Sequence, residues 1–265
     1  MSDYSLTLSD AEIARYHQMA EAAREDEHAL WEAAGIRPGA RIADVGCGPG
    51  AITIVLAELV GESGDVHGVD RDETALATAR ELAARSGLSN TRFLAGPVDA
   101  TGLPPAAFDV VMMRHVLAHN GGREQAIVDH LATLARPGGT VYLVDVDADR
   151  LQIKPVIPEL EDLNAAYLAL HARRGNDLSV GRRLPRLLAA AGLEAVEFHD
   201  HSRVITPRPG SRPPAWAARE TLVTEGLATR DDLARWDRAL TAFDRDDVPL
   251  EVSLSQLCAY ARRPT

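Results

Sequence analysis

The sequence predicts an α/β fold: a doubly wound, Rossmann-like sheet of seven strands, mostly parallel and covered by helices. Three observations lead to it. Continuous apolar strand patterns alternate with amphipathic helix patterns from Arg41 to Asp147, as in a parallel sheet buried on both faces. The first strand runs into a glycine-rich loop and a helix, ADVGCGPGA at residues 43–51. After Asp147 the strand patterns interleave polar and apolar residues, which indicates an antiparallel hairpin at one edge.

A leading helix is expected from Ser9 to about Gly35, because its apolar residues recur near one helical face. Five strands and three helices follow, with two successive strands after the second helix. The expected strands are ARIADVG (40–46), DVHGVD (65–70), TRFLAG (91–96), FDVVMMRHV (108–116) and TVYLVDVD (140–147), and the helices are residues 51–61, 72–87 and 123–135, the last ended by RPGG.

Beyond Asp147 the alternation gives way to two helix patterns, at 158–175 and 178–193, and a strand pattern at 194–205. A Pro/Arg-rich stretch at 206–216 leads to helices around 215–243 and a closing strand at 250–264. We expect one domain over 1–265: a helical cap (1–38), a cofactor-binding core (39–147) and a C-terminal part (148–265), in which helical insertions at about 148–178 and 204–247 form a lid.

Composition narrows the class of function. The chain has 265 residues, 46% of them hydrophobic, and a net charge of −11 without a Lys/Arg block, which argues against nucleic acid as a partner. Two cysteines indicate a reducing compartment. No signal peptide and no run of about 18 uncharged apolar residues is present, so we expect a cytoplasmic protein without a membrane partner. The oligomeric state is left open, a homodimer included.

The loop at 43–51 fits more than one cofactor. Gly46, Gly48 and Ala51 satisfy G-x-G-x-x-G/A, and Asp70 ends the next strand where a carboxylate can hold a ribose, as in dinucleotide sites. Asp44 would repel a pyrophosphate, however, and Pro49 removes one N–H that a phosphate would use. S-adenosylmethionine carries a sulfonium, an ammonium and a ribose diol, so the charge balance favours it.

The ordered motifs ADVGCGPG, GVDRD, PVDA, FDVV and RPGG resemble those of class I S-adenosylmethionine-dependent methyltransferases. The similarity covers about Arg41 to Asp147. Within that family the chain is similar to the small-molecule branch that includes ubiquinone/menaquinone C-methyltransferases and many natural-product methyltransferases. The resemblance implies S-adenosylmethionine as cofactor, S-adenosylhomocysteine as product and a small-molecule methyl acceptor.

Cofactor roles follow from the resemblance position by position. Asp44 would face the methionine amino group, Asp70 would accept from both ribose hydroxyls, and Arg71 would lie along the adenine, where the family often has an apolar residue. Asp99 would accept from the adenine amino group. The remaining expected contacts are the loop residues Gly46, Cys47, Gly48 and Gly50, the Ala100 N–H toward an adenine nitrogen, the Arg114 carbonyl toward the methionine ammonium, and Tyr16 with Met19 closing over the cofactor.

Some of these residues also fit a purely structural role. Asp44 and Asp70 would then cap loops, and Asp99 would start a turn. Cys47 is expected to be a small loop residue and not a nucleophile, because nothing near it in sequence marks it as activated. Tyr16 would be a core contact of an amphipathic helix.

The candidate catalytic residues lie in RHVLAHN (114–120), at the carboxyl end of the fourth strand. His115 and His119 are the candidate bases, since an imidazole titrates near neutrality, although packing or capping would explain them as well. Many relatives have paired histidines here, whereas this chain has Ala118 before His119. Candidate acceptor-pocket residues are His171, Tyr167 and Asn164 on the helix at 158–175, with Trp216 and Trp236 in the second insertion, although packing among the lid helices would explain each of them as well. His199 and His201 have no further ligand at a recognisable spacing, so we expect no metal site.

The sequence therefore favours a small-molecule methyltransferase acting on carbon, oxygen or nitrogen, in natural-product or quinone-like metabolism. Two alternatives remain at this point. One is a non-catalytic module that binds S-adenosylmethionine on a methyltransferase fold. The other is an NAD-dependent oxidoreductase, which requires the parallel sheet to continue after Asp147.

Overall fold

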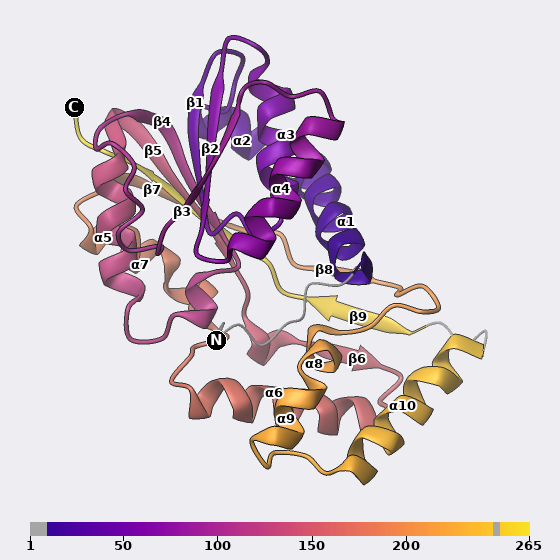
Figure 1. Ribbon diagram of the computed structural model, residues 1–265. Helices are drawn as coiled ribbons and strands as arrows, with labels where there is room; N and C mark the ends of the chain where they lie inside the picture. Colours follow the sequence, from indigo (N-terminus) through magenta and orange to yellow (C-terminus); the bar gives the residue numbers. More distant parts are fainter. Residues whose placement is uncertain (1–9, 246–249) are drawn as a thin grey trace.

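The computed structural model describes residues 10–245 and 250–265 of the chain. Seven strands form the main sheet, and they are β1 (Arg41–Val45), β2 (Asp65–Asp70), β3 (Thr91–Ala95), β4 (Phe108–Arg114), β5 (Ala135–Asp145), β7 (Glu194–Asp200) and β10 (Leu257–Arg262). They lie side by side in the order β3-β2-β1-β4-β5-β10-β7 (Figure 1).

The direction of the strands distinguishes the alternatives left by the sequence. All neighbours from β3 to β5 are parallel, whereas β10 is antiparallel to both β5 and β7. The doubly wound, mostly parallel sheet with an antiparallel C-terminal hairpin is therefore confirmed. The strand that follows β5 in the sheet is antiparallel to it, so the continued parallel sheet required by the oxidoreductase alternative is not formed.

Helices cover both faces of this sheet. They are α1 (Asp10–Asp26), α2 (His28–Ala34), α3 (Ala51–Val60), α4 (Glu73–Arg85), α5 (Glu124–Leu134) and α7 (Leu184–Ala190). Alternate strand residues point to opposite faces. Ile42 and Met112 pack with α1, α2 and α3 on one face, and Ala43 and Met113 pack with α5 and α7 on the other.

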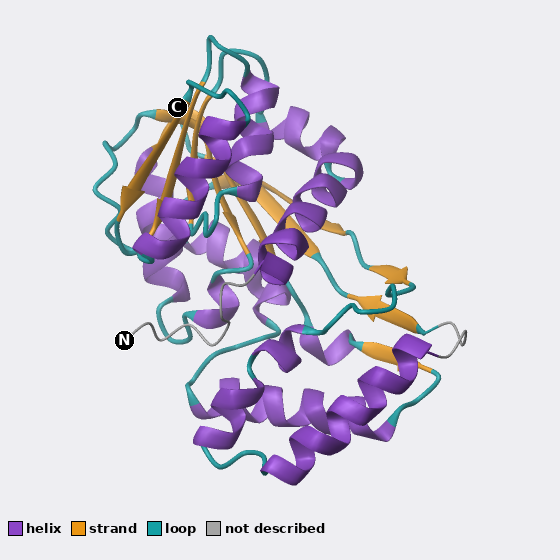
Figure 2. Cartoon of the chain, turned by 45° about the vertical axis from the view of Figure 1, so that its right-hand side comes forward, coloured by secondary structure: helices purple, strands orange, loops and turns teal. Residues whose placement is uncertain are grey.

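The insertions form a separate layer below the carboxyl ends of the strands (Figures 1 and 2). Its helices are α6 (Pro158–Arg173), α8 (Pro214–Ala217), α9 (Arg219–Thr224) and α10 (Arg230–Arg245), and its small antiparallel sheet has the order β6 (Gln152–Lys154), β9 (Glu251–Leu254), β8 (Arg203–Ile205). The layer has its own apolar cluster, which includes Leu163, Leu222 and the fully buried Trp236. We refer to this layer as the lid. Three short 3-10 helices are η1 (Leu117–His119), η2 (Ala148–Arg150) and η3 (Val180–Arg183), and η1 contacts α6 of the lid through His119 and His171.

Three expected elements are wrong in their boundaries. The strand expected at 194–205 is two strands, because the Asp200 carboxylate accepts from the Ser202 N–H in a turn that directs β8 into the lid. The strand expected at 250–264 likewise splits into β9 in the lid and β10 in the main sheet. The Arg136–Gly139 segment, expected to end a helix, already belongs to β5, where the register with β4 shifts.

The leading helix is also two helices, and Glu27 lies at the break between them. Its side chain is fully buried and accepts five hydrogen bonds. Arg114 donates two of them, at 2.6 and 2.9 Å. The other donors are the Tyr142 hydroxyl at 2.7 Å, the Gln256 amide at 2.6 Å and the Trp31 indole at 3.2 Å.

These five bonds decide the protonation state of Glu27. Burial acts to raise its pKa, but the Arg114 guanidinium and the hydrogen bonds from Tyr142 and Trp31 outweigh burial and hold the pKa below its usual value. A charged pair is therefore buried between the N-terminal helices and the sheet.

Among the described residues, every helix is too short or too polar to cross a lipid bilayer.

We predict that Glu27→Ala lowers the free energy of unfolding by about 3–5 kcal/mol, because it leaves the buried Arg114 charge without its partner. Urea denaturation measures the change. Glu58→Ala is the matched control, since Glu58 pairs with Arg24 at 2.8 Å while both side chains are about 40% exposed. The control is expected to cost at most about 1 kcal/mol. An equal loss of unfolding free energy in the two variants would show that the buried pair of Glu27 matters no more to stability than an exposed one.

Candidate functional site

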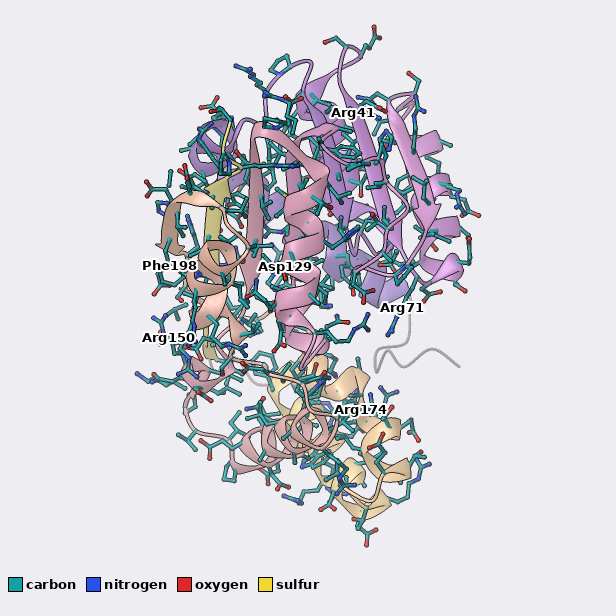
Figure 3. The ribbon with its side chains drawn as sticks, turned by 90° about the vertical axis from the view of Figure 1, so that its left-hand side faces the viewer. Arg41, Arg71, Asp129, Arg150, Arg174 and Phe198 are labelled. Atoms are coloured by element: carbon teal, nitrogen blue, oxygen red, sulfur yellow. The ribbon has the colours of Figure 1, made fainter. Side chains whose placement is uncertain are left out.

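The carboxyl ends of β1, β2 and β4 face the lid. In Figure 3, Arg41 marks the start of β1 at one end of the sheet. Arg71, which directly follows β2, lies at the other end, the end nearer to Arg174 in the lid. Ligands of open α/β sheets bind at this carboxyl edge. The structure therefore brings the loop at 46–50, the ends of β2 and β4, and the lid to one side of the sheet.

The glycine loop between β1 and α3 is closely packed at Gly46 and Gly50 and open at Gly48. A Cβ on Gly46 would lie 2.5 Å from Val116, and one on Gly50 would lie 2.7 Å from Ala79, so both positions exclude a side chain. Gly48 has a φ of +52°, and a Cβ there would meet nothing within 4 Å. The backbone at Gly48 is thus held in the left-handed region with open space beside it, as a ligand that approaches the main chain requires.

Asp70 connects this loop to the next strand. Its Oδ2 accepts from the Gly48 N–H at 2.9 Å, and its Oδ1 accepts from the Asp72 N–H at 3.0 Å. A carboxylate has about four lone-pair sites, so each oxygen keeps one for a further donor. The carboxylate is therefore fixed in orientation and still able to accept two hydroxyl groups, the number that a ribose diol supplies.

Asp44 lies beneath the loop and is 3% exposed. The Thr53 hydroxyl donates to its Oδ2 at 2.6 Å. Burial raises the pKa of Asp44 to about 6, although the Thr53 hydrogen bond and the Arg114 charge act against burial. A cationic ligand would bind favourably beside this carboxyl group, because a nearby ammonium stabilises its ionised form.

Three residues, Arg71, Asp99 and Ala100, are expected around an adenine. Arg71 is exposed, and Asp99 forms an ion pair with Arg123 at the start of α5, which lowers the pKa of Asp99. The Ala100 N–H donates to the Pro97 carbonyl at 3.2 Å. Contact of this N–H with an adenine nitrogen would require that turn to open, so the roles of Asp99 and Ala100 stay predictions.

Cys47 and Tyr16 are both packed into the protein. Cys47 is 8% exposed, and burial raises the pKa of its thiol well above its ordinary value, so the thiol stays protonated. Tyr16 packs at the edge of the cluster between α1 and α3, with the Arg15 guanidinium 4.9 Å from its ring centre. The expected contacts of Cys47 and Tyr16 with the cofactor stay predictions.

Arg114 and His115 lie at the carboxyl end of β4. The Arg114 side chain is engaged with Glu27, so only its backbone carbonyl is a candidate for the methionine ammonium. His115 has a φ of +55°, which is unusual for a residue with a side chain. Burial, followed by the charge of Arg114, lowers the pKa of His115 to about 3, and its Nε2 has no hydrogen-bond partner within the described part of the chain.

His119 lies at the end of η1, where the core meets the lid. Its ring centre is 4.9 Å from that of His171 on α6, and the His171 ring is 4.5 Å from that of Tyr167. Burial lowers the pKa of both histidines to about 4, with like-charge repulsion from His171 as the second cause for His119. Two neutral imidazoles therefore adjoin, one from each layer.

Asp145, at the end of β5, holds η1 in place, and the sequence reasoning missed it. Its Oδ2 accepts from the Ala118 N–H at 3.1 Å, and its Oδ1 accepts from the Val146 N–H at 2.9 Å. Asp145 is fully buried, and burial raises its pKa to about 7. A carboxylate at the carboxyl end of an apolar strand was the available signal. Glu27 gave no comparable signal, because charged residues are common on the outer face of a helix.

Metal ligands do not cluster in the part of the chain that the structure describes, where no group of three or more His, Cys, Asp or Glu side chains is arranged to hold an ion.

Comparison with known proteins identifies relatives of this architecture. Residues 36–192 match a family model described as a methyltransferase domain. The chain is 28% identical over 208 residues to a ubiquinone/menaquinone biosynthesis C-methyltransferase of Azotobacter vinelandii, with 71% of this chain and 81% of that protein covered. It is 29% identical over 192 residues to a demethylmenaquinone methyltransferase of Lactococcus lactis, with 66% and 76% covered.

Solved structures share the fold at lower identity. The YcgJ protein of Bacillus subtilis superposes with a TM-score of 0.60 at 18% identity, over 91% of this chain and 99% of that one. Phosphoethanolamine N-methyltransferase 2 of Haemonchus contortus, in complex with S-adenosyl-L-methionine, gives a TM-score of 0.58 at 17% identity, over 91% and 53%. At these identities the likeness establishes the fold alone.

We predict that the affinity for S-adenosylmethionine falls as pH decreases below about 6. The pKa of Asp44 is raised to about 6, so the carboxyl takes up a proton below this pH, and only the ionised form attracts the ammonium. Affinity should fall about tenfold per pH unit below 6 and be constant above it.

Calorimetry between about pH 5 and 7.5 measures this dependence. Asp44→Asn is the control, because its side chain has a similar shape and does not titrate. It should bind weakly at every pH and lose the slope. A slope retained in Asp44→Asn would assign the titration to another group.

Proposed function

The chain belongs to the class I S-adenosylmethionine-dependent methyltransferases, and we propose that it methylates a small natural-product or quinone-like acceptor bound between the sheet and the lid. The observation that carries the proposal is that Asp44, Asp70 and the open loop at Gly48 lie together at the carboxyl edge of the sheet, the edge that faces the lid (Figure 1). The relatives from Azotobacter vinelandii and Lactococcus lactis support the acceptor class, because one is named as a ubiquinone/menaquinone biosynthesis C-methyltransferase and the other as a demethylmenaquinone methyltransferase.

The charges and donors of the site fit S-adenosylmethionine. Asp44 would attract its ammonium, together with the Arg114 carbonyl, and the loop at Gly46, Cys47, Gly48 and Gly50 would lie against its methionine and ribose. Asp70 would accept from the ribose hydroxyls. Arg71, Asp99 and Ala100 would bind the adenine, and Tyr16 would close the site from α1. When bound, the cofactor supplies a sulfonium methyl group to a nucleophile and leaves as S-adenosylhomocysteine.

His119 is proposed as the residue that accepts a proton from the methyl acceptor. The His119 ring contacts the lid through His171. His115 has a positive φ and is buried beside the charged Arg114, which lowers its pKa further, so we propose it only as a secondary candidate. An imidazole with a pKa near 4 is a weak base. It therefore suits an acceptor that becomes acidic as the new bond to the methyl carbon forms.

We predict that Asp70→Ala abolishes detectable binding of S-adenosylhomocysteine by calorimetry, since the variant loses both ribose contacts and the Gly48 N–H bond that shapes the loop. Asp65→Ala is the control, because Asp65 starts the same strand at the opposite end. Unchanged binding by Asp70→Ala, or binding of NAD in place of S-adenosylhomocysteine, would refute the proposed cofactor site.

We predict that His119→Ala lowers kcat at least about a hundredfold at saturating cofactor, as loss of a general base does. The affinity for S-adenosylhomocysteine should not change. His199→Ala, in the outer strand β7, is the control and should retain activity. Because the pKa of His119 is about 4, wild-type activity should be independent of this group from about pH 5 to 8.

The non-catalytic alternative makes a different prediction. Such a module would bind S-adenosylmethionine and S-adenosylhomocysteine and would methylate none of a broad panel of hydroxyquinones, phenols and amines. No observation favours it over the enzyme.

A further inference from the structure

His171 is a buried histidine that the motifs of the family do not include. It lies near the end of α6, is 2% exposed, and contacts His119 of the core and Tyr167 of its own helix. Because η1 follows the carboxyl end of β4, its contact with His119 places His171 on the lid side of the proposed acceptor site.

The hydrogen bonds of Asn176 fix the orientation of its amide group. The Gly121 N–H, which is able only to donate, lies 3.3 Å from Asn176 Oδ1. The amide nitrogen Nδ2 is consequently directed at His171 Nδ1, at 3.1 Å. An amide nitrogen is only a donor, so His171 Nδ1 must be the acceptor.

This bond decides the tautomer of His171. Burial, followed by the Arg174 charge, lowers its pKa to about 4, so the ring is neutral at pH 7. In a neutral imidazole one nitrogen accepts and the other carries the hydrogen. Since Nδ1 accepts from Asn176, the hydrogen is on Nε2.

His171 Nε2 is buried, and none of the described residues, 10–245 and 250–265, supplies it with a hydrogen-bond partner. A buried N–H group left in this state destabilises the folded protein, because it has lost its hydrogen bond to water without gaining another. Such a cost is expected where a ligand supplies the missing acceptor.

The arrangement is fixed by a contact between the two layers. A Cβ on Gly121 would lie 1.7 Å from the Gly175 carbonyl oxygen, so only glycine lets the loop after η1 meet the end of α6 this closely. That approach brings the Gly121 N–H to Asn176 and sets the ring next to His119.

We propose that His171 Nε2–H donates a hydrogen bond to an oxygen of the methyl acceptor, and that this acceptor is a phenol or an enol. The proposal rests on the proposed function and specifies its substrate class. An amine acceptor offers no such oxygen, and a phenolic or enolic oxygen accepts most strongly when it carries negative charge.

The donor acts on the negative charge that forms as the acceptor loses its proton. The acceptor loses one proton to His119 or water, and its electron pair forms the bond to the methyl carbon while the sulfur–carbon bond breaks and leaves its pair on sulfur. In carbon methylation the negative charge is shared with the oxygen beside the reacting carbon. A preorganised N–H directed at that oxygen stabilises the charge, and His171 keeps its proton throughout.

His171 is thus assigned a different role from His119. Its lone pair is used by Asn176, so it does not accept the substrate proton.

The first experiment measures the tautomer without any turnover. Nitrogen-15 NMR of the histidine side chains at pH 7, with the His171 signals assigned by their absence in His171→Leu, should show the Nε2–H form. Addition of naphthohydroquinone under anaerobic conditions to the protein saturated with S-adenosylhomocysteine should shift the Nε2 signal. An Nδ1–H form, or no shift, would overturn the proposal.

The second experiment measures methylation of naphthohydroquinone and, as the matched amine, naphthylamine. His171→Leu should lower kcat/KM for naphthohydroquinone about a hundredfold, as removal of an oxyanion donor does. His171→Gln, which keeps a terminal N–H, should recover most of the loss. Calorimetric affinity for S-adenosylhomocysteine should be the same in all three proteins, which also shows that the variants fold.

His67→Leu is the matched control for loss of a buried histidine. His67 is 5% exposed and also has a ring nitrogen that no described residue hydrogen-bonds, but it lies in β2, a strand of the main sheet. It should keep the wild-type kcat/KM. An unchanged kcat/KM in His171→Leu, or wild-type activity on naphthylamine alone, would overturn the donor role.

Failure of the proposed function gives a different result. In that case the wild-type protein methylates neither probe, while the NMR measurement still decides whether His171 donates to an oxygen ligand.

Discussion

The buried ion pair of Glu27 and Arg114 is the interaction on which the arrangement of the site depends. Arg114 ends β4, and its backbone leads directly to His115 and η1. Tyr142 and Gln256 bind the same carboxylate, so the N-terminal helices, the centre of the sheet and the chain returning from the lid meet at one group. A buried ion pair adds little net stability over an apolar replacement, but loss of one partner is costly. Its effect is to fix which segments meet.

The second constraint is the close approach of backbone at Gly121 and Gly175. It couples the loop after η1 to the end of α6, and Asn176 converts that contact into an orientation of His171. Asp145 acts on the same turn from the side of the core, because it accepts from the Ala118 N–H. The two imidazoles at the layer boundary are therefore positioned from both sides by hydrogen bonds to the backbone. This preorganisation is what electrostatic stabilisation of a reacting group requires.

The ionisable groups of the site separate into two kinds. Burial raises the pKa of Asp44 to about 6 and that of Asp145 to about 7, so both carboxyls titrate near neutrality. Burial lowers the pKa of His119 and His171 to about 4, which keeps both rings neutral. One end of the site thus favours a cationic ligand, and the other offers uncharged donors and acceptors. A sulfonium cofactor and a nearly neutral aromatic acceptor match that division.

The sequence by itself determined the parallel core, the antiparallel return and the cofactor loop, because these depend on local periodicity and on spacing within one βαβ unit. Asp44, Gly48 and Asp70 all lie within 27 consecutive residues, 44–70. Only the tertiary structure decided the roles of Glu27 and His171. Apart from Trp31 on the next helix, the partners of Glu27 are 87, 115 and 229 residues away, and those of His171 include His119 from another layer. The division of the two late strands between the main sheet and the lid was undecided for the same reason: a local pattern of alternating residues predicts a strand and does not specify which strand pairs with it.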